Sequence, residues 1–230
     1  MPKNKVVSVE AAISRIESGM TIAVGGFLSQ GDPLTLLRAL KASDVRDLIL
    51  YSICGGVRDR GIVELVNAGK VRKLVASHIG TTPDVVRALH DGKIEVELVP
   101  QGTLAEQLRC GGAGLGGFLT RTGIGTAVAE GKQHVDVGGV PHLLEFAIRT
   151  DVALVRAHTG DFWGNLRYRG TAANYNPLCA MCADHTIAEV EFLCGIGEIG
   201  PESIHTPGIY VDAVVRSDVD YCGEPNCTDT

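Results

Sequence analysis

"TIAVGGFLSQGDP", residues 21–33, runs from a short apolar segment through a glycine-rich loop to a proline. Residues 21–24 have the length and composition of a buried strand. Asp32 can cap a following helix, and Pro33 suits the first helical position. The stretch therefore predicts a strand, a tight loop and a helix N-terminus, which is the opening unit of an α/β fold.

Two explanations fit the glycines of this loop. A tight turn needs glycine wherever φ is positive, which alone accounts for most of these residues. Alternatively, bare backbone amides face an anionic or thioester oxygen, helped by the positive end of the helix. Glycine serves both uses, so residue chemistry leaves the two explanations equally supported.

Strand and helix patterns alternate through the first half of the chain. Expected strands cover 21–24, 46–52, 71–77 and 93–99, and expected helices cover 9–16, 33–40, 61–69, 83–91 and 103–110. Ser8, Asp32 and Thr82 are the predicted caps, and Thr103 with Glu106 has capping-box spacing. This alternation predicts a three-layer α/β sandwich with a mostly parallel sheet. Ligands bind such sheets at the carboxyl ends of the strands, where residues 25–31 lie.

The second half adds a hairpin and further strands. Gly138 and Gly139 suit a hairpin turn within 134–145. Strands are expected at 151–157, 165–170 and 186–193, with a helix that Asn176 caps and Pro177 starts. We expect one domain over residues 1–218, a loosely ordered tail at 219–230, and no internal repeat.

Composition excludes several classes of protein. The 230 residues are 45% hydrophobic, which supports a substantial core. A net charge of -6 with 21 Lys plus Arg argues against binding of duplex nucleic acid. No signal peptide is evident, and no apolar run approaches the roughly 20 residues of a membrane span. We expect a cytoplasmic protein that binds neither nucleic acid nor membrane.

Seven cysteines form no small-domain disulfide pattern and are expected to be mostly reduced. Cys179, Cys182 and His185 form C-x-x-C-x-x-H. A zinc site needs about four ligands, and this trio starts within a predicted helix, so core cysteines are favoured over a metal. Cys222 and Cys227 form a pair that can oxidise after lysis. No metal is expected.

The glycine-rich segment 111–117 formally contains G-x-G-x-x-G at Gly112, Gly114 and Gly117. A dinucleotide fingerprint follows a strand and opens a helix, whereas this segment follows a helix. A nicotinamide or flavin site is therefore disfavoured. The glycines instead suit a close passage of two backbones, at a subunit boundary or at the site, or a flexible loop.

"GMTIAVGGFLSQGDP" resembles the signature of family I coenzyme A transferases, with Ser18 as a departure where Asp or Asn is usual. Further stretches resemble, in order, the alpha subunit of 3-oxoacid-type CoA transferases over nearly the whole chain. They are "VRKLVASHIGT", "VELVPQGTLAEQLRCGGAGLGGFLTRTGIGT", "EGK", "GNLRYRGTAANYNP", "TIAEVE" and "IHTPGIYVD".

The resemblance implies an enzyme that moves coenzyme A from an acyl-CoA to a small free carboxylic acid by a ping-pong mechanism. In the family, the nucleophile is the glutamate of a Ser-Glu-Asn-Gly motif, carried by a second half or by a beta subunit. This chain contains no Glu-Asn-Gly, and Glu106 and Glu130 suit a helix cap and a surface position. The resemblance thus implies an alpha subunit that needs a beta subunit. The thioester is the substrate, and no tightly bound cofactor is implied.

By resemblance, Gly25, Gly26 and Phe27 shape the loop that faces the acyl group, where amides can stabilise an oxyanion. Gln101 matches a glutamine near the substrate carboxylate, although it could instead tie its own loop together. Further candidates for the lining of the site are Ile53, Cys54, His78, Gly114 and Gly116.

The chain departs from the family at two places. Ile53 and Cys54 stand where a pair of asparagines is frequent, and Ala173 replaces the arginine of a usual Ala-Arg-Asn. The substrates that are usual in the family therefore cannot be assigned to this chain. An acyl-CoA hydrolase or ring-opening CoA enzyme on this fold is one alternative. A non-catalytic regulatory or ligand-binding protein is the other.

Overall fold

A computed structural model describes residues 4–219 and Tyr221. Its centre is an eight-stranded sheet in the order β11-β10-β8-β1-β2-β3-β4, with β9 beside β8. All neighbours on this path are parallel, and only β9 pairs antiparallel. The strands are β1 Thr21–Val24, β2 Leu48–Tyr51, β3 Val71–Ala76, β4 Glu95–Leu98, β8 Thr150–Asp161, β9 Leu166–Arg167, β10 Ala183–Cys194 and β11 Ala213–Arg216.

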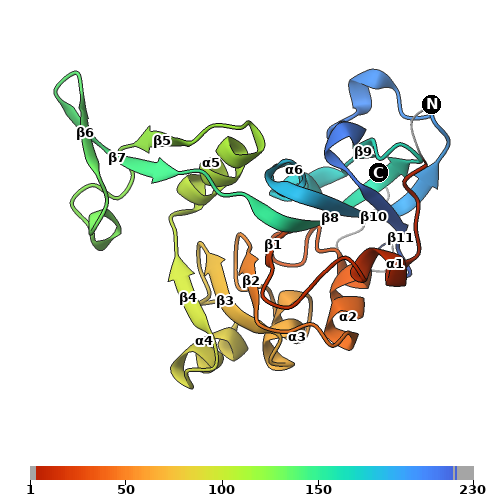
Figure 1. Cartoon of the computed structure of the whole chain (residues 1–230), viewed down its shortest axis with the longest axis horizontal. Helices are drawn as coiled ribbons and strands as arrows, with labels where there is room; N and C mark the ends of the chain where they lie inside the picture. The colour runs from red at the N-terminus through yellow and green to blue at the C-terminus, as the bar shows by residue number, and fades with distance from the viewer. Residues whose placement is uncertain (1–3, 220, 222–230) are drawn as a thin grey trace.

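Helices cover both faces of this sheet (Figure 1). The α-helices are α1 Val9–Ile13, α2 Leu34–Ala42, α3 Ile62–Asn67, α4 Pro83–His90, α5 Gln101–Gly112 and α6 Asn176–Cys182. Short 3-10 helices are η1 Ala127–Ala129, η2 Gly170–Ala173, η3 Pro201–Ser203 and η4 Gly208–Tyr210. In β1, Ile22 and Val24 pack in the core under α1–α4, and Ala23 packs in the core under α5 and α6. The predicted three-layer α/β sandwich is confirmed.

A second, three-stranded antiparallel sheet projects from the body at the left of Figure 1. It consists of β5 Gly117–Thr120, β6 His134–Val137 and β7 Val140–Phe146, in the order β5-β7-β6. We call residues 117–146 the arm. Gly138 and Gly139 have φ angles of 61° and 80° and form the predicted hairpin turn. Strand β5 was not expected, because its glycine-rich start indicated only a loop.

Two predicted helix caps have different outcomes. The hydroxyl of Ser8 accepts a hydrogen bond from the amide of Ala11, as predicted for α1. The prediction for Asp32 is wrong, because α2 begins at Leu34 with Pro33 in the capping position and no side-chain cap. Asp32 is buried against the glycine loop, where its Oδ1 would lie 2.0 Å from a Cβ on Gly26.

Three further predictions of helix-capping side chains are also wrong. Thr82 precedes α4, but its hydroxyl donates to the carbonyl of Gly56 at 2.6 Å. Thr103 lies inside α5, which starts at Gln101, so Thr103 and Glu106 form no capping box. Asn176 is the first residue of α6 and its side chain bonds elsewhere. For Thr82 and Asn176, hydrogen bonds to other segments replace the local cap, whereas for Thr103 the earlier start of α5 removes it.

The second half of the main sheet differs in extent from the prediction. Strands β8 and β10 each have 12 residues, because they pair with one another along their full length, whereas β9 has 2. Strand β11 was not predicted. Of the predicted tail 219–230, only Val219 and Tyr221 are described, and Tyr221 is buried rather than loosely held. Among the described residues, no helix has the length and apolarity to cross a membrane.

Candidate functional site

The carboxyl ends of β1, β2 and β3 gather most of the predicted site residues. The rings of Phe27 and His78 meet edge to face, with centroids 6.2 Å apart. The amide of Gly55 donates to the carbonyl of His78 at 2.9 Å, which joins the loops after β2 and β3. Gln101 follows β4, and its carbonyl accepts a hydrogen bond from the Tyr175 hydroxyl at 2.7 Å. The parallel sheet thus brings these four loops to one edge.

The loop after β1 has a strained conformation. Phe27 and Gln30 exchange two backbone hydrogen bonds of 2.9 Å. Between them, Leu28 and Ser29 have φ angles of 47° and 69°, a region that residues with a Cβ rarely enter. Such strain persists only where surrounding contacts hold it, and it clusters at binding sites.

The loop after β2 has the same design as the loop after β1. "GGVRDRG" at 55–61 matches "GGFLSQG" at 25–31 in its glycine positions. Val57 and Arg60 pair as Phe27 and Gln30 do, and Asp59 has a φ of 57°. Each loop leads from a strand into a helix. The shared glycine spacing is the signal by which the sequence could have revealed the pair.

Packing explains the glycines of the first loop. A Cβ on Gly25 would lie 1.9 Å from Oδ1 of Asn176, and one on Gly26, whose φ is 109°, would meet Asp32. The amides of Gly25 and Phe27 are already bonded, to the carbonyls of Leu154 and Gln30 at 2.9 Å. Gly26 therefore carries the one amide of this trio that donates to no group in the described part of the chain.

The fully buried side chain of Asn176 ties this loop to α6. Its Oδ1 accepts from the amide of Arg156 at 2.9 Å. Its Nδ2 donates to the carbonyls of Gly31 at 3.1 Å and Ala172 at 2.8 Å. Asn174 also reaches the loop, donating to the carbonyl of Gln30 at 2.8 Å. Asn176 thus positions the loop. The sequence did not indicate this role, because Asn176 was interpreted as a helix cap.

The N-terminus of α2 is occupied by groups of the chain itself. The amide of Leu36 donates to Oε2 of Glu189 at 3.2 Å, and that of Leu34 donates to the Tyr221 hydroxyl at 3.2 Å. Oε1 of Glu189 accepts from Tyr221 and Ser217, each at 2.7 Å. These two amides are therefore engaged within the chain, and the assistance of a ligand by the positive end of this helix stays a prediction. A buried carboxylate takes that place.

Burial raises the pKa of Glu189 above its ordinary value of 4.5, against hydrogen bonds that lower it. A raised folded-state pKa means that the folded chain holds the proton to higher pH than the unfolded chain. Stability from this group is therefore complete below about pH 4.5 and is lost as pH rises through the folded pKa. Relative to Glu189→Gln, the melting temperature of the native chain should fall as the pH rises above about 4.5. A difference that stays constant with pH would refute this.

Ile53 and Cys54 lie beneath the paired loops rather than open to solvent. Burial raises the pKa of the Cys54 thiol, and hydrogen bonds from the backbone of Leu28 and Gly56 oppose that shift. Cys54 thus links the two loops as a neutral thiol and is no exposed nucleophile. His78 is half-buried, and its Nδ1 lies 3.2 Å from Oγ of Ser77.

Gly114 and Gly116 do not join this site. They follow the end of α5 opposite to Gln101, about 18 Å away along a 12-residue helix. A Cβ on either would meet no atom within 4 Å. Close backbone passage occurs instead at Gly111, where a Cβ would lie 1.9 Å from the carbonyl oxygen of Ile148. That passage is within the chain, between α5 and the start of β8.

The C-x-x-C-x-x-H residues are not arranged for metal binding. Cys179 and Cys182 point into the core, and burial raises the pKa of Cys182 to about 11. His185 lies on β10, with Nδ1 3.7 Å from Oδ2 of Asp212. Within residues 4–219 and Tyr221, no three metal-binding side chains cluster. Cys222 and Cys227 lie outside the described residues.

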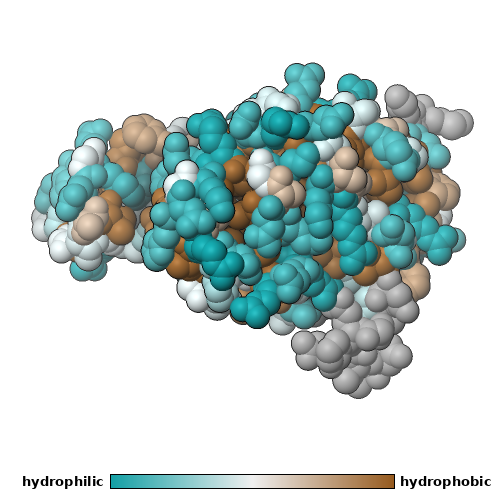
Figure 2. Space-filling model, turned by 90° about the horizontal axis from the view of Figure 1, so that it is seen from below, coloured by the Kyte–Doolittle hydropathy of each residue, from teal (hydrophilic) through white to brown (hydrophobic). Residues whose placement is uncertain are grey.

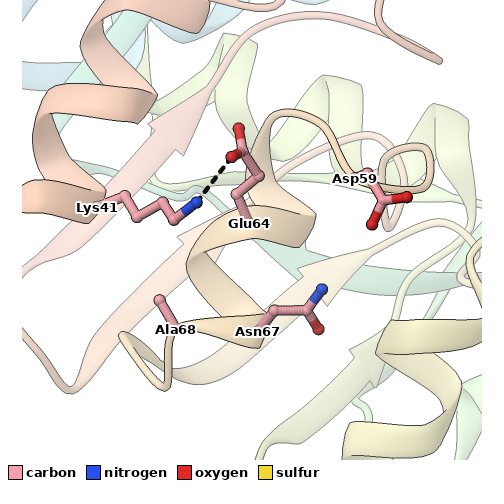
Figure 3. A pocket seen from close by; sticks show the side chains of 5 residues that line it. All are labelled: Lys41, Asp59, Glu64, Asn67 and Ala68. Atoms are coloured by element: carbon pink, nitrogen blue, oxygen red, sulfur yellow. Dashed lines mark hydrogen bonds and ion pairs between the residues drawn. The ribbon is translucent and has the colours of Figure 1, made fainter.

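A polar hollow of about 260 Å³ lies between α2 and α3 and is lined by Lys41, Asp59, Glu64, Asn67 and Ala68 (Figure 3). An ion pair of 2.8 Å between Lys41 and Glu64 crosses it. It contains none of the predicted site residues. Only Asp59 connects it to the paired loops.

Comparison with known proteins identifies the family. The family model described as Coenzyme A transferase matches residues 6–217. The chain is 49% identical over 215 residues to the alpha subunit of the acetate CoA-transferase of Escherichia coli (strain K12), covering 94% of this chain and 98% of that protein. It is 46% identical over 208 residues to one subunit of a probable succinyl-CoA:3-ketoacid coenzyme A transferase of Bacillus subtilis (strain 168), covering 90% and 87%.

A solved structure agrees with these sequence matches. The apoenzyme of an acyl-CoA transferase from Escherichia coli O157:H7 superposes with a TM-score of 0.83 at 25% identity. The match covers 94% of this chain and 47% of that one, so the chain corresponds to about half of that protein. Sequence and fold agree: this chain belongs to the coenzyme A transferase family.

Proposed function

We propose that the chain is the alpha subunit of a hetero-oligomeric CoA transferase that moves coenzyme A from a short or medium acyl-CoA to a small carboxylic acid. The observation that carries this is the 49% identity, over nearly the full length of both chains, to a protein named as the alpha subunit of an acetate CoA-transferase. The fold supplies a fitting site, where four βα loops meet at one edge of the sheet.

The nucleophile is proposed to come from a beta subunit with a Ser-Glu-Asn-Gly motif. The loops at 25–31 and 53–61 contain no glutamate. The glutamate carboxylate attacks the thioester carbon and expels the CoA thiolate, forming an acyl-glutamyl anhydride. The thiolate then attacks the glutamyl carbonyl, which releases the donor acid and leaves a glutamyl-CoA thioester. The acceptor acid reverses both steps. No tightly bound cofactor takes part, because the thioester brings its own activation.

This chain supplies the surroundings of that reaction. The amide of Gly26, for which the described residues supply no acceptor, is proposed to donate to the oxyanion that forms on the thioester carbonyl. Such a hydrogen bond is worth several kcal/mol in acyl transfer. Phe27 and His78 supply a wall for the acyl group. The side chain of Gln101 is exposed, and the Tyr175 hydroxyl bonds its backbone carbonyl rather than its side chain. The side-chain amide is therefore proposed to donate to a substrate carboxylate.

Gln101→Ala in the assembled enzyme should lower kcat/KM by about 10- to 100-fold, the worth of one hydrogen bond to a charged group. The melting temperature should change little, because the side chain is exposed. Gln101→Glu should be worse, since it places a negative charge beside the carboxylate. Steady-state kinetics with varied acceptor acid measures both. Unchanged kinetics would assign Gln101 to holding its own loop.

The proposed reaction is tested by incubating the alpha–beta pair with acyl-CoA in the presence and absence of acceptor acid. A transferase forms a new acyl-CoA and releases thiol only slowly. Thiol release that does not require an acceptor would favour the hydrolase alternative. No turnover of any acyl-CoA by an intact pair would favour a regulatory or ligand-binding role.

A further inference from the structure

One face of the arm is apolar and uncovered by the chain. Directly opposed residues of antiparallel strands share a face, and Leu119 faces Leu144 while Val137 faces Val140. The face carries Leu119, Val135, Val137, Val140, Leu144 and Phe146, and His142 is its polar member. The Phe146 side chain is 69% exposed.

The opposite face of the same sheet is covered by other residues of the chain. Leu143 is fully buried and Glu145 is 3% exposed. A Cβ on Gly123 would lie 3.4 Å from a methyl group of Leu143, which places the segment after β5 over this face. Nζ of Lys132 lies 2.6 Å from Oε1 of Glu145, and Nε2 of Gln107 donates to its Oε2 at 3.2 Å. The chain thus satisfies even a buried charge on one side. It leaves the apolar side to another molecule.

The apolar face of the arm is too small to form a stable interface by pairing with a second arm alone. Three strands of up to seven residues span about 14 by 24 Å, or roughly 340 Å². A stable, specific interface buries about 800 Å² on each partner. The partner must therefore contact residues of the chain beyond this face. Two further exposed leucines, Leu98 and Leu115, lie just before and just after α5 and are 57% and 49% exposed. In Figure 2, where the arm projects at the left, hydrophobic residues reach its surface.

We propose that this face is the docking surface for the beta subunit, an inference that rests on the proposed function. The chain matches 47% of the solved single-chain acyl-CoA transferase, and its relative of 49% identity is named as an alpha subunit. A second part of the enzyme, the proposed beta subunit, therefore has to pack against this one. The partner should present a matching apolar surface, since the face offers no charged side chain to pair.

The test is Phe146→Asp in the chain co-expressed with a Ser-Glu-Asn-Gly beta subunit from the same organism. Affinity for the beta chain, measured by sedimentation or titration, should fall at least about 100-fold. The melting temperature of the separate alpha chain should be unchanged. Ile209→Asp is the matched control, because Ile209 lies on η4 and is 85% exposed. This variant should assemble normally with the beta chain. Val137→Asp repeats the test at a second position of the face.

Full assembly of both arm variants would overturn the proposal. So would loss of self-association with beta binding intact, because the face would then belong to a second copy of this chain. A wild-type pair that assembles and turns over acyl-CoA leaves the proposed function standing in either case. A wild-type pair that neither assembles nor reacts would instead count against the proposed function itself.

Discussion

Asn176→Ala is expected to lower the free energy of unfolding by about 3 to 5 kcal/mol. The substitution strands a buried amide of Arg156 and two buried carbonyls, on Gly31 and Ala172, and each unsatisfied group costs about 1 to 3 kcal/mol. Urea denaturation followed by circular dichroism measures the loss. Asn67→Ala, at an exposed position on α3, is the control and should stay within about 0.5 kcal/mol of the native chain.

The same site offers a test of the contact with Gly25. Gly25→Ala places its Cβ 1.9 Å from Oδ1 of Asn176, so it should destabilise the native chain strongly. In the Asn176→Ala background that atom is gone, and Gly25→Ala should cost clearly less. Coupling of this kind is expected of residues in direct contact. Additive losses would show that Oδ1 of Asn176 is not what excludes a side chain at position 25.

Gly111→Ala should cost about 3 kcal/mol, the upper end of the range for overpacking, since backbone moves less easily than a side chain. The new Cβ would lie 1.9 Å from the carbonyl oxygen of Ile148, so α5 must shift. Gly102→Ala is the matched control in the same helix, where a Cβ meets nothing within 4 Å. It should stabilise by about 0.5 kcal/mol, because alanine favours helix. Thermal melts of both variants should shift in opposite directions, and equal shifts would contradict the packing argument.

The parallel sheet and its layers were predictable because they depend on local patterns. Strand β1 was predicted to the residue, since an apolar run before paired glycines has few other solutions. The hairpin at Gly138 and Gly139 was predictable for the same reason, as its turn needs two positive φ angles. It was also predictable that Phe27, Cys54 and His78 lie at one edge of the sheet, because ligand sites of parallel sheets form at the carboxyl ends of the strands.

The details that failed depend on contacts between distant segments. Asp32, Thr103 and Asn176 have the chemistry of caps, but the helices do not start where these caps require. Helix α2 has Pro33 rather than Asp32 in the capping position, and α5 begins before Thr103. The side chain of Asn176 bonds Arg156 and Gly31, which are 20 and 145 residues away in the sequence. No local sequence pattern indicates that Glu189 and Tyr221 bond the first amides of α2. Glu189 is 153 residues from Leu36, and Tyr221 is 187 residues from Leu34. The bare apolar face of the arm likewise became visible only once the register of β5 and β7 was known.

The central claim is that the chain works as one half of an enzyme whose nucleophile lies on the other half. Its most direct test is an intact-mass spectrum of the purified alpha–beta pair before and after incubation with acyl-CoA. A CoA-sized adduct on the beta chain and an unchanged mass for this chain are the expected result. An adduct on this chain, or turnover by this chain alone, would contradict it.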